Sequence, residues 1–462
     1  MKARKIVICF DGTGNEVGDN QTNIVKLYNA LRDDDDQITH YVPGVGTFDE
    51  PRLFDWKFRQ RARSIAGLAF GLGLEDDVLD AYRFLCRSYK GTSQKNRDWN
   101  IEQGLKRELG RQEKPPTRPE AQKDRIYIFG FSRGAYAARI LAGFIHNFGL
   151  IEPDKLHLVT GAFRAYRSVT DHERDAPHSV IFRQLRRYDE TLKPDNSVPI
   201  RALCLFDTVS SMVGFQRPLR NLARFYSPMA LRVHANVLSN PSVRIVLHAL
   251  AVDEKRSMFR PLLWQPDEAY FGNRFRHEKQ RRSQFVRQRW FPGYHSDIGG
   301  SPTEWNSGIG KITLLWMLDA LERAEIEADR EDRALAPPDP KRALALPPPG
   351  LKLNPGRRRV HLEGRDREAR SLDGKPYARP DAMAPIHDSM SLGWLPLEVL
   401  PKSIKRRDWP LRLPWLGKWY LPLEEPRRIP ENHEIDSSVT DRMARWRFYR
   451  PVNLPLDWPE GS

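Results

Sequence analysis

The sequence predicts an α/β fold in which a mainly parallel sheet has helices on both faces. Two observations support this class. Compact apolar runs alternate with longer segments of helical periodicity, and turn-rich loops follow several of these runs. Such alternation favours a parallel sheet wrapped by its connecting helices. Strands are expected at residues 5–10, 39–42, 125–130, 200–206, 243–252 and 285–291.

The segments between the strands are assigned in chain order. The first strand ends in a turn-rich loop at 11–15, and a helix is expected at about 22–31 with Thr22 or Asn23 as its cap. A Gly-rich apolar segment then runs into a helix that ends near residue 89. Residues 66–74 of the Gly-rich segment are a candidate mobile lid. Another helix is expected at about 309–328.

Composition divides the chain into three parts. Residues 1–330 hold all the expected strands and form the α/β domain, with a polar surface insertion at about 90–123. Residues 331–355 are rich in proline and are expected to be a linker or arm. Residues 356–462 are rich in Trp, Pro and Arg, and we expect this C-terminal extension to pack back on the core.

Cysteine usage argues against metal and disulfide chemistry. The 462-residue chain has three cysteines, no CxxC pair and no histidine cluster at zinc-ligand spacing, so no metal site and no cofactor are expected. Cys9 and Cys204 lie in apolar runs and are expected to be buried as small hydrophobic side chains.

The net charge of +15 favours anionic partners. Acidic or apolar residues interrupt the basic stretches and no nucleic-acid motif is visible, so we expect a solvated basic surface, with peripheral contact to an anionic membrane kept open, and no nucleic-acid partner. The apolar run at 6–10 is too short for a signal peptide and no apolar run reaches about 18 residues, so a chain made soluble in the cytoplasm is expected. Any export would use a route without a signal peptide.

The strongest local motif is the GxSxG sequence Gly130–Gly134, which follows the apolar strand at 125–130 and opens a helix. This context predicts a strained turn between strand and helix that presents Ser132 as a nucleophile. The two glycines are needed because a side chain at either position would collide with the neighbouring strand or helix. The expected fold is therefore of the α/β-hydrolase type.

A serine nucleophile needs a base within hydrogen-bond reach and a carboxylate that orients the base. His295 fits the base because it lies in a Gly-rich loop after the strand at 285–291. His248 lies in the middle of a strand and is interpreted as a core residue. His387 and His433 lie in the C-terminal extension and are interpreted as surface or packing residues.

Two carboxylates compete for the orienting role, because Asp207 and Asp253 each end a predicted strand. Position slightly favours Asp253, since the acid in this fold usually comes from the strand before the histidine. The sequence 253–256 is instead typical of a salt-bridged corner. We rank Asp207 first, partly on the resemblance described below, and keep Asp253 as the alternative.

An oxyanion hole needs two backbone N–H groups. The N–H of Arg133, directly after the nucleophile, is one candidate, and that of Gly12 or Thr13 is the other. The same Asp-Gly-Thr sequence occurs in a phosphatase motif whose nucleophilic Asp stands two residues earlier. Here that position holds Cys9, which excludes the phosphatase interpretation.

Several motifs in order resemble the α/β-hydrolase family that includes type VI secretion phospholipase effectors. The motifs are Phe10–Asn15, Gly130–Ala135, Phe206–Val209, Ala251–Glu254 and Trp290–Gly300. The resemblance implies a triad of Ser132, Asp207 and His295 and hydrolysis of phospholipid acyl esters. It also implies secretion machinery or an immunity protein as a partner.

The expected function is that of a phospholipase A type enzyme acting at anionic bilayers. Aromatic and basic residues at 409–420 suit membrane contact, although packing on the core is the simpler interpretation. One alternative is an esterase or thioesterase with a soluble substrate. A second alternative is a catalytically silent binding module that uses the basic surface.

Overall fold

The structure is a computed structural model. It describes residues 3–12, 21–44, 73–90, 123–168, 180–195, 198–209, 213–215, 229–231, 234, 236–265, 269–273, 278, 281–335, 346–390, 394–399, 402–403, 414–415 and 419–454. Residues 91–122 of the predicted insertion, most of the candidate lid and residues 336–345 of the predicted linker lie outside these ranges.

Within the described ranges, seven strands form one sheet in the order β12-β8-β7-β4-β3-β1-β2, and all neighbours are parallel. This confirms the predicted fold class and its six strands. The seventh strand, β12, comes from the C-terminal extension. The bounds are β1 (Lys5–Phe10), β2 (Gln37–Val42), β3 (Arg125–Phe131), β4 (Ile200–Phe206), β7 (Val243–Ala251), β8 (Phe285–Phe291) and β12 (Glu434–Ile435).

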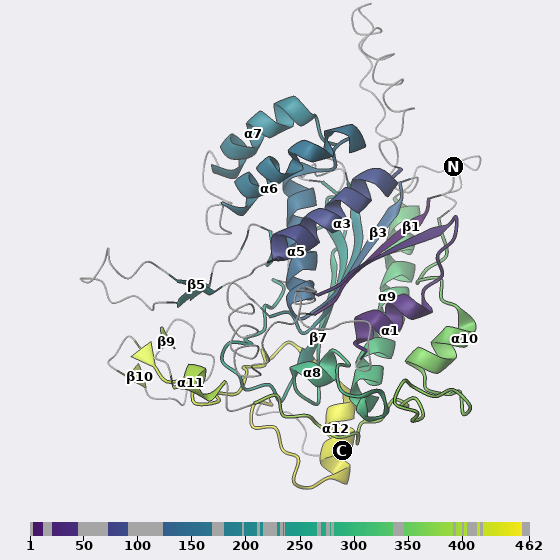
Figure 1. Cartoon of the computed structure of the whole chain (residues 1–462), viewed down its shortest axis with the longest axis vertical. Coiled ribbons are helices and arrows are strands. Elements are labelled where there is room, and N and C mark those ends of the chain that lie inside the picture. Colours follow the sequence, from purple (N-terminus) through teal and green to yellow (C-terminus); the bar gives the residue numbers. More distant parts are fainter. Residues whose placement is uncertain are drawn as a thin grey trace, which may run out of the picture.

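Helices cover both faces of this sheet (Figure 1). On one face α3 (Leu74–Ser88), α5 (Arg133–Phe148) and α6 (Val159–Arg167) pack on side chains such as Ile8 of β1. On the other face α1 (Asn23–Ala30) and α9 (Gly308–Ala334) pack on alternate side chains such as Cys9. Burial on both faces explains why β1, β3, β4 and β7 are continuous apolar runs.

Shorter elements complete the described chain. Two small antiparallel sheets lie apart from the main sheet, with orders β5-β6 and β10-β11-β9. The remaining bounds are η2 (Pro153–Leu158), α7 (Val180–Leu192), β5 (Val213–Phe215), β6 (Met229–Leu231), α8 (His295–Ile298), η5 (Glu304–Asn306), α10 (Pro355–Arg357), η7 (Arg358–Leu362), α11 (Leu395–Glu398), β9 (Lys402–Ser403), β10 (Pro414–Trp415), β11 (Trp419–Tyr420) and α12 (Ser437–Arg445).

Helix α9 is longer than predicted and ends at Ala334, so residues 331–334 are helical and not part of a linker. The extra turn is stabilised by Arg244 of β7, which contacts both Glu331 and Asp332. In the C-terminal extension, α12 packs Val439 and Met443 against Trp290 of β8. The extension therefore packs on the end of the sheet through a hydrophobic cluster of its own.

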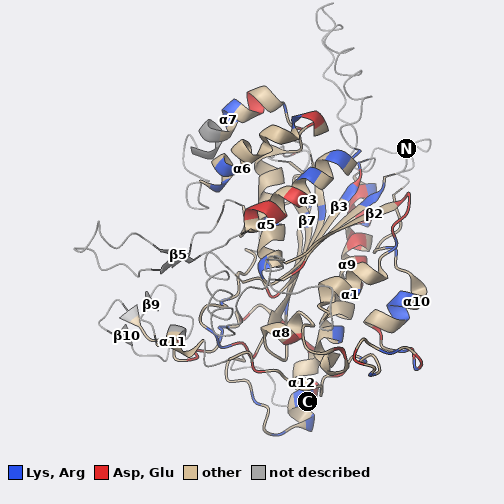
Figure 2. Ribbon diagram, in the orientation of Figure 1, with Lys and Arg blue, Asp and Glu red and all other residues tan. Residues whose placement is uncertain are grey.

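Basic and acidic residues are mixed along the described elements. Figure 2 shows Lys and Arg interspersed with Asp and Glu along the described helices, rather than gathered on one element. Among these helices, none combines the length and the hydropathy that crossing a bilayer would need.

Candidate active site

Ser132 occupies the sharp turn between β3 and α5, with φ 57° and ψ −121°. This positive φ is rare for a residue with a side chain and marks local strain. A Cβ on Gly130 would lie 2.6 Å from Ala135 Cα, and one on Gly134 would lie 2.5 Å from the Phe10 carbonyl oxygen. The structure thus gives the glycines of the motif the steric role that the sequence predicted.

His295 begins the short helix α8, four residues after the end of β8. Its Nε2 lies 2.7 Å from Ser132 Oγ. Both side chains are nearly buried, and the imidazole stacks on the Phe131 ring with 4.9 Å between ring centroids. The ring of Phe259 meets the same imidazole edge-on, so packing on two sides limits how far His295 can turn.

Asp207 directly follows β4, which pairs with β3, the strand that leads to Ser132. Its Oδ2 lies 2.5 Å from His295 Nδ1, and its Oδ1 accepts the Ala251 N–H over 3.1 Å. The side chain is fully buried and its φ is 42°, a second strained position at the same edge of the sheet. Ser132, His295 and Asp207 therefore form one continuous hydrogen-bonded chain.

Asp253, the alternative acid, faces a different set of partners. Its Oδ2 accepts the Gly293 N–H at 2.6 Å and the Tyr449 hydroxyl at 2.7 Å. Burial is the main reason why the pKa of Asp253 is raised to about 6. Asp253 thus holds the glycine turn before His295, while the carboxylate that meets the imidazole is that of Asp207.

The predicted salt-bridged corner is present at Glu254. Arg256 donates to both oxygens of the Glu254 carboxylate, over 2.9 and 2.8 Å. Oxygen Oε2 also accepts the backbone N–H of His295 at 3.2 Å. The corner therefore helps to fix the start of α8, a contact that the sequence did not indicate.

The charge states of the site follow from burial and its partners. Burial pushes the pKa of Asp207 upward, but the Arg427 charge and the hydrogen bond with His295 outweigh burial and hold that pKa well below its ordinary value. Burial also lowers the pKa of His295, against the opposing effect of Asp207. At neutral pH the pair is an anionic Asp207 and a neutral His295.

The three residues predicted as oxyanion-hole donors differ in where the structure places their backbone N–H groups. Arg133 begins α5, at the end of the helix where backbone N–H groups and the helix dipole favour negative charge. The Gly12 N–H donates to the carboxylate of its own neighbour, Asp11 Oδ1, over 2.6 Å, so this donor is already engaged. Thr13 lies outside the described ranges and stays a prediction.

Asp11 organises this loop through further hydrogen bonds. Its carboxylate also accepts the hydroxyl groups of Thr22 and Tyr41, each over 2.9 Å. Thr22 in turn caps α1 by accepting the Val25 N–H. Asp11, the first residue after β1, is thus tied to both the cap of the first helix and the second strand.

The other histidines largely follow expectation. His248 is fully buried in β7 and its Nε2 accepts the Thr208 N–H at 3.0 Å, which makes it a core residue beside Asp207. His433 packs against β8 and accepts the Trp290 indole N–H at 2.9 Å. His387 has a larger role than predicted, because it contacts Asp297 within the α8 loop.

Arg427 is the residue at the site that sequence reasoning missed. It lies in the C-terminal extension, is buried, and donates to both oxygens of Asp207. Its surroundings in the sequence are rich in proline and in charges of both signs and have no periodicity, so no pattern distinguishes Arg427 from its neighbour Arg428.

The described part of the chain also bears on metal and thiol chemistry. Among the described residues, no group of three or more His, Cys, Asp or Glu side chains could hold a metal ion. Cys9 and Cys204 are buried as predicted, and burial raises the pKa of each thiol, which suppresses the reactive thiolate.

A strained strand–turn–helix serine, with a histidine and an acid at the carboxyl edge of a parallel sheet, defines the α/β-hydrolase class. The family model described as the type VI secretion system phospholipase effector Tle1-like catalytic domain matches residues 4–320. The chain belongs to this family.

Individual relatives are more distant. An uncharacterized protein of Saccharomyces cerevisiae is 29% identical over 269 residues, which are 57% of this chain and 33% of that protein. A solved structure of an uncharacterized protein from Pseudomonas aeruginosa is 17% identical, with a TM-score of 0.32, over 75% of this chain and 49% of its own. The Tle1 effector bound to the VgrG spike of the type 6 secretion system is 20% identical, with a TM-score of 0.29, over 65% of this chain and 51% of its own.

The chain is therefore short beside these proteins. It spans about a third of the yeast relative and about half of each solved chain.

Proposed function

We propose that this chain is a serine ester hydrolase that cleaves acyl esters of membrane phospholipids through an acyl-enzyme intermediate on Ser132. The observation that carries the proposal is the contact chain from Ser132 Oγ to His295 Nε2, at 2.7 Å, and from His295 Nδ1 to Asp207, at 2.5 Å. Membership of a phospholipase effector family supports a phospholipid as the substrate.

In the acylation step, His295 Nε2 accepts the Ser132 hydroxyl proton while Oγ attacks the ester carbonyl carbon. Anionic Asp207 holds the Nδ1 proton of His295 and stabilises the imidazolium that forms. The Arg133 N–H, with Thr13 as the second proposed donor, stabilises the negative charge on the carbonyl oxygen. The ester C–O bond then breaks, and His295 gives its proton to the departing lysolipid oxygen.

In the deacylation step, the same groups act on water. His295 Nε2 removes a proton from a water molecule, which attacks the acyl carbonyl carbon on Ser132. The tetrahedral intermediate collapses, the proton returns to Ser132 Oγ, and a fatty acid leaves. The buried, neutral state of His295 suits it to act as the base in both steps.

The proposal is tested by incubating the purified chain with vesicles that contain an anionic phospholipid and analysing the products by mass spectrometry. We expect fatty acid and lysolipid from the wild type. Ser132→Ala and His295→Ala should each lower the rate by about 10⁴-fold or more. Ser389→Ala is a matched control, because this serine lies near the site but contacts Ser296 and not His295.

Other outcomes would separate the alternative functions. Hydrolysis of a water-soluble ester without hydrolysis of any vesicle lipid would discard the membrane substrate and keep the hydrolase. Vesicle binding with no hydrolysis, and no labelling of Ser132 by a fluorophosphonate, would favour the silent binding module.

We also propose export by a type VI secretion system, on the basis of family membership. The test is to compare the amount of the chain in the culture medium of cells with and without a working secretion system. Equal amounts in both media would contradict the proposal.

A further inference from the structure

Arg427 and Asp207 form a bidentate ion pair inside the protein. Arg427 Nη1 donates to Asp207 Oδ1 over 2.6 Å, and Nη2 donates to Oδ2 over 2.9 Å. Relative exposure is 1% for the arginine and 0% for the aspartate. Two N–H groups on two oxygens fix the plane of the carboxylate as well as its charge.

The arginine also connects Asp207 to the other side of the histidine. Nη1 donates to the Ala251 carbonyl at the end of β7, over 3.2 Å, and Nη2 donates to the Phe259 carbonyl over 2.5 Å. Phe259 is the residue whose ring packs edge-on against the His295 imidazole. One guanidinium thus holds the acid and the backbone of a residue that limits the rotation of the base.

The segment that carries Arg427 is fastened on both sides. The Arg427 carbonyl accepts the Asn453 side-chain N–H over 3.0 Å, and the same amide donates to the Val252 carbonyl over 2.9 Å. Two residues before Arg427, Glu425 pairs with Arg260 at 2.5 Å. The geometry of the guanidinium is therefore set by the extension as a folded unit.

A buried carboxylate without such a partner would take up a proton more easily, because burial disfavours the charged form. A protonated Asp207 could not stabilise the imidazolium that forms when His295 removes the serine proton. Arg427 lies outside residues 4–320, the region that matches the catalytic-domain family. A chain cut back to the matched region would therefore lose the Arg427 counter-charge of Asp207.

We propose that Arg427 is a positioning residue that keeps Asp207 anionic and aligned with His295, and that the C-terminal extension is for this reason a working part of the active site. This inference rests on the proposed serine hydrolase function.

The charged and titratable groups around this pair determine the expected pH dependence. Asp207 faces Arg427, His295 and, from β7, the neutral His248, while His295 also faces Glu254 and Arg256. Removing the arginine cation makes protonation easier for Asp207 and also for His295. Both changes lower activity on the acid side, so the acid limb of the pH profile moves to higher pH.

The experiment measures the pH profile of kcat/KM for a water-soluble nitrophenyl ester with the full-length chain. Arg427→Met is expected to lower kcat by about 10–100-fold, less than loss of the acid itself. It should also move the acid limb up by about one pH unit or more. Arg427→Lys keeps the charge but cannot hold both oxygens of the Asp207 carboxylate. The acid limb of its pH profile should therefore stay closer to that of the wild type, while kcat remains reduced.

Arg442→Met is the matched control. Arg442 is a buried arginine of the same extension that donates to the carbonyls of Ala382 and Ala384 and makes no contact with Asp207. Its loss should lower thermal stability without moving the acid limb. An equal shift of the limb in Arg442→Met would mean that general packing, and not the Asp207 contact, is responsible, and would overturn the inference.

Three further outcomes are decisive. In the first, Arg427→Met has the wild-type kcat and the wild-type acid limb of the pH profile, while Ser132→Ala is inactive in the same assay. This result would show that the inference is wrong while the proposed function stands. Activity of Ser132→Ala would instead contradict the proposed function. If Arg427→Met does not fold, Arg427→Lys tests the inference instead. A wild-type kcat and a wild-type pH profile in Arg427→Lys would rule out a need for bidentate alignment of Asp207.

Discussion

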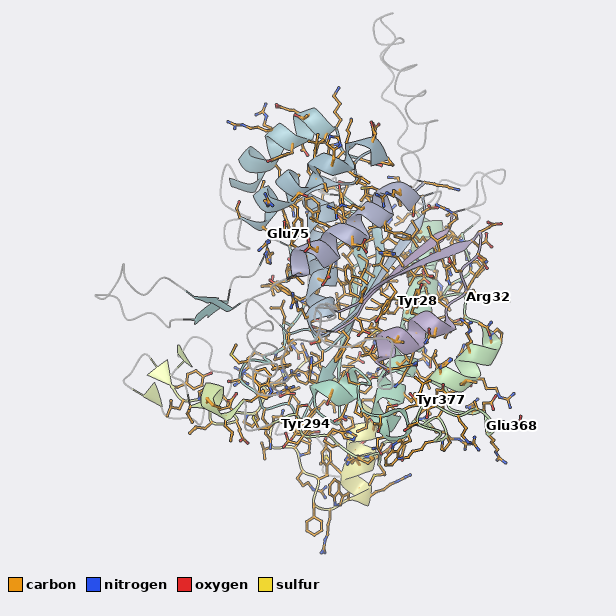
Figure 3. All side chains as sticks on the ribbon, in the orientation of Figure 1. Tyr28, Arg32, Glu75, Tyr294, Glu368 and Tyr377 are labelled. Atoms are coloured by element: carbon orange, nitrogen blue, oxygen red, sulfur yellow. The ribbon has the colours of Figure 1, made fainter. Side chains whose placement is uncertain are left out.

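His387 and Asp297 form a hydrogen-bonded pair that ties the C-terminal extension to the loop carrying His295. His387 Nδ1 lies 2.7 Å from Asp297 Oδ1, and the His387 backbone N–H donates to Oδ2 over 3.1 Å. The same oxygen accepts the N–H of Tyr294, which Figure 3 labels beside α8, over 2.9 Å. The extension therefore contacts the loop that carries His295 through His387, and it contacts Asp207 through Arg427.

Replacing His387 should affect both stability and activity. His387→Ala removes one side-chain partner of the buried Asp297, which should lower the free energy of unfolding by about 1 kcal/mol. Because Asp297 fixes the turn before His295, kcat/KM should also fall, by about tenfold. His157→Ala is the control, since His157 is exposed at the end of η2. Thermal unfolding and ester kinetics identical to those of the control would contradict the prediction.

The two candidate acids should respond differently to the same amide replacement. Asp207→Asn removes the anion that faces His295 and Arg427, so kcat should fall by about 10⁴-fold. The buried Arg427 cation would also lose its partner, at a cost of about 3–5 kcal/mol in stability. Asp253→Asn keeps an oxygen for Gly293 or Tyr449 and should retain activity within about tenfold of wild type. The reverse order of activities would reassign the acid to Asp253.

The elbow glycines are predicted to tolerate no side chain. Gly134→Ala would place its Cβ against the backbone at the end of β1, where Phe10 and the following Asp11 cannot move without disturbing the sheet. We expect loss of labelling by a fluorophosphonate probe and a fall in stability of about 1–3 kcal/mol. Gly356→Ala is the control, because a Cβ there meets only Asn354 Oδ1 at 3.5 Å. Normal labelling of Gly134→Ala would show that the turn has more room than its geometry indicates.

The wild-type pH profile should reflect the buried state of His295. The base is active only when neutral, and burial lowers the pKa of His295. The acid limb of kcat/KM should therefore lie below pH 6.5, the ordinary pKa of a histidine. Asp207 should not contribute a second step in this range, because Arg427 and His295 hold its pKa well below ordinary values, although burial opposes them. A midpoint above the ordinary histidine value would contradict this assignment of charges.

A buried charge cluster beneath the His295 loop should be sensitive to neutralisation. Glu304 lies between Lys26 Nζ at 3.0 Å and Lys311 Nζ at 2.6 Å, and all three side chains are buried. Glu304→Gln removes the anion that the two buried lysines share, which should cost about 3–5 kcal/mol at acidic pH, where the lysines carry their charge. The matched change Glu190→Gln removes one side of an exposed pair with Arg186 and should cost about 0.5 kcal/mol.

The stability lost in Glu304→Gln should depend on pH. Burial, and then the charge of Lys26, lowers the pKa of Lys311 to about 7, below its unfolded value of 10.5. The folded state therefore binds fewer protons than the unfolded state between these values, and stability rises with pH across this range. Removing Glu304 lowers the lysine pKa further, so thermal unfolding of Glu304→Gln should show a larger deficit at acidic than at alkaline pH. An equal stability deficit at acidic and alkaline pH would contradict the role of the lysine charges.

The sequence by itself determined the parts of the molecule that depend on neighbouring residues. Apolar runs and helical periodicity predicted the six long strands and their crossover helices, because burial on both faces of a parallel sheet requires continuous apolar strands. The spacing of Gly130, Ser132 and Gly134 predicted the strained elbow, since its steric conflicts arise within one strand–turn–helix unit.

Only the tertiary structure decided how distant residues meet. Asp207 and Asp253 both follow strands of the same sheet, so strand pattern could not separate them, and the choice came from which carboxylate reaches the imidazole. The engagement of the Gly12 N–H depends on the side-chain orientation of Asp11, which no sequence pattern specifies. Arg427 lies 220 residues beyond Asp207. Its position depends on the packing of an extension that has no periodicity, so short-range sequence patterns contain no information about this contact.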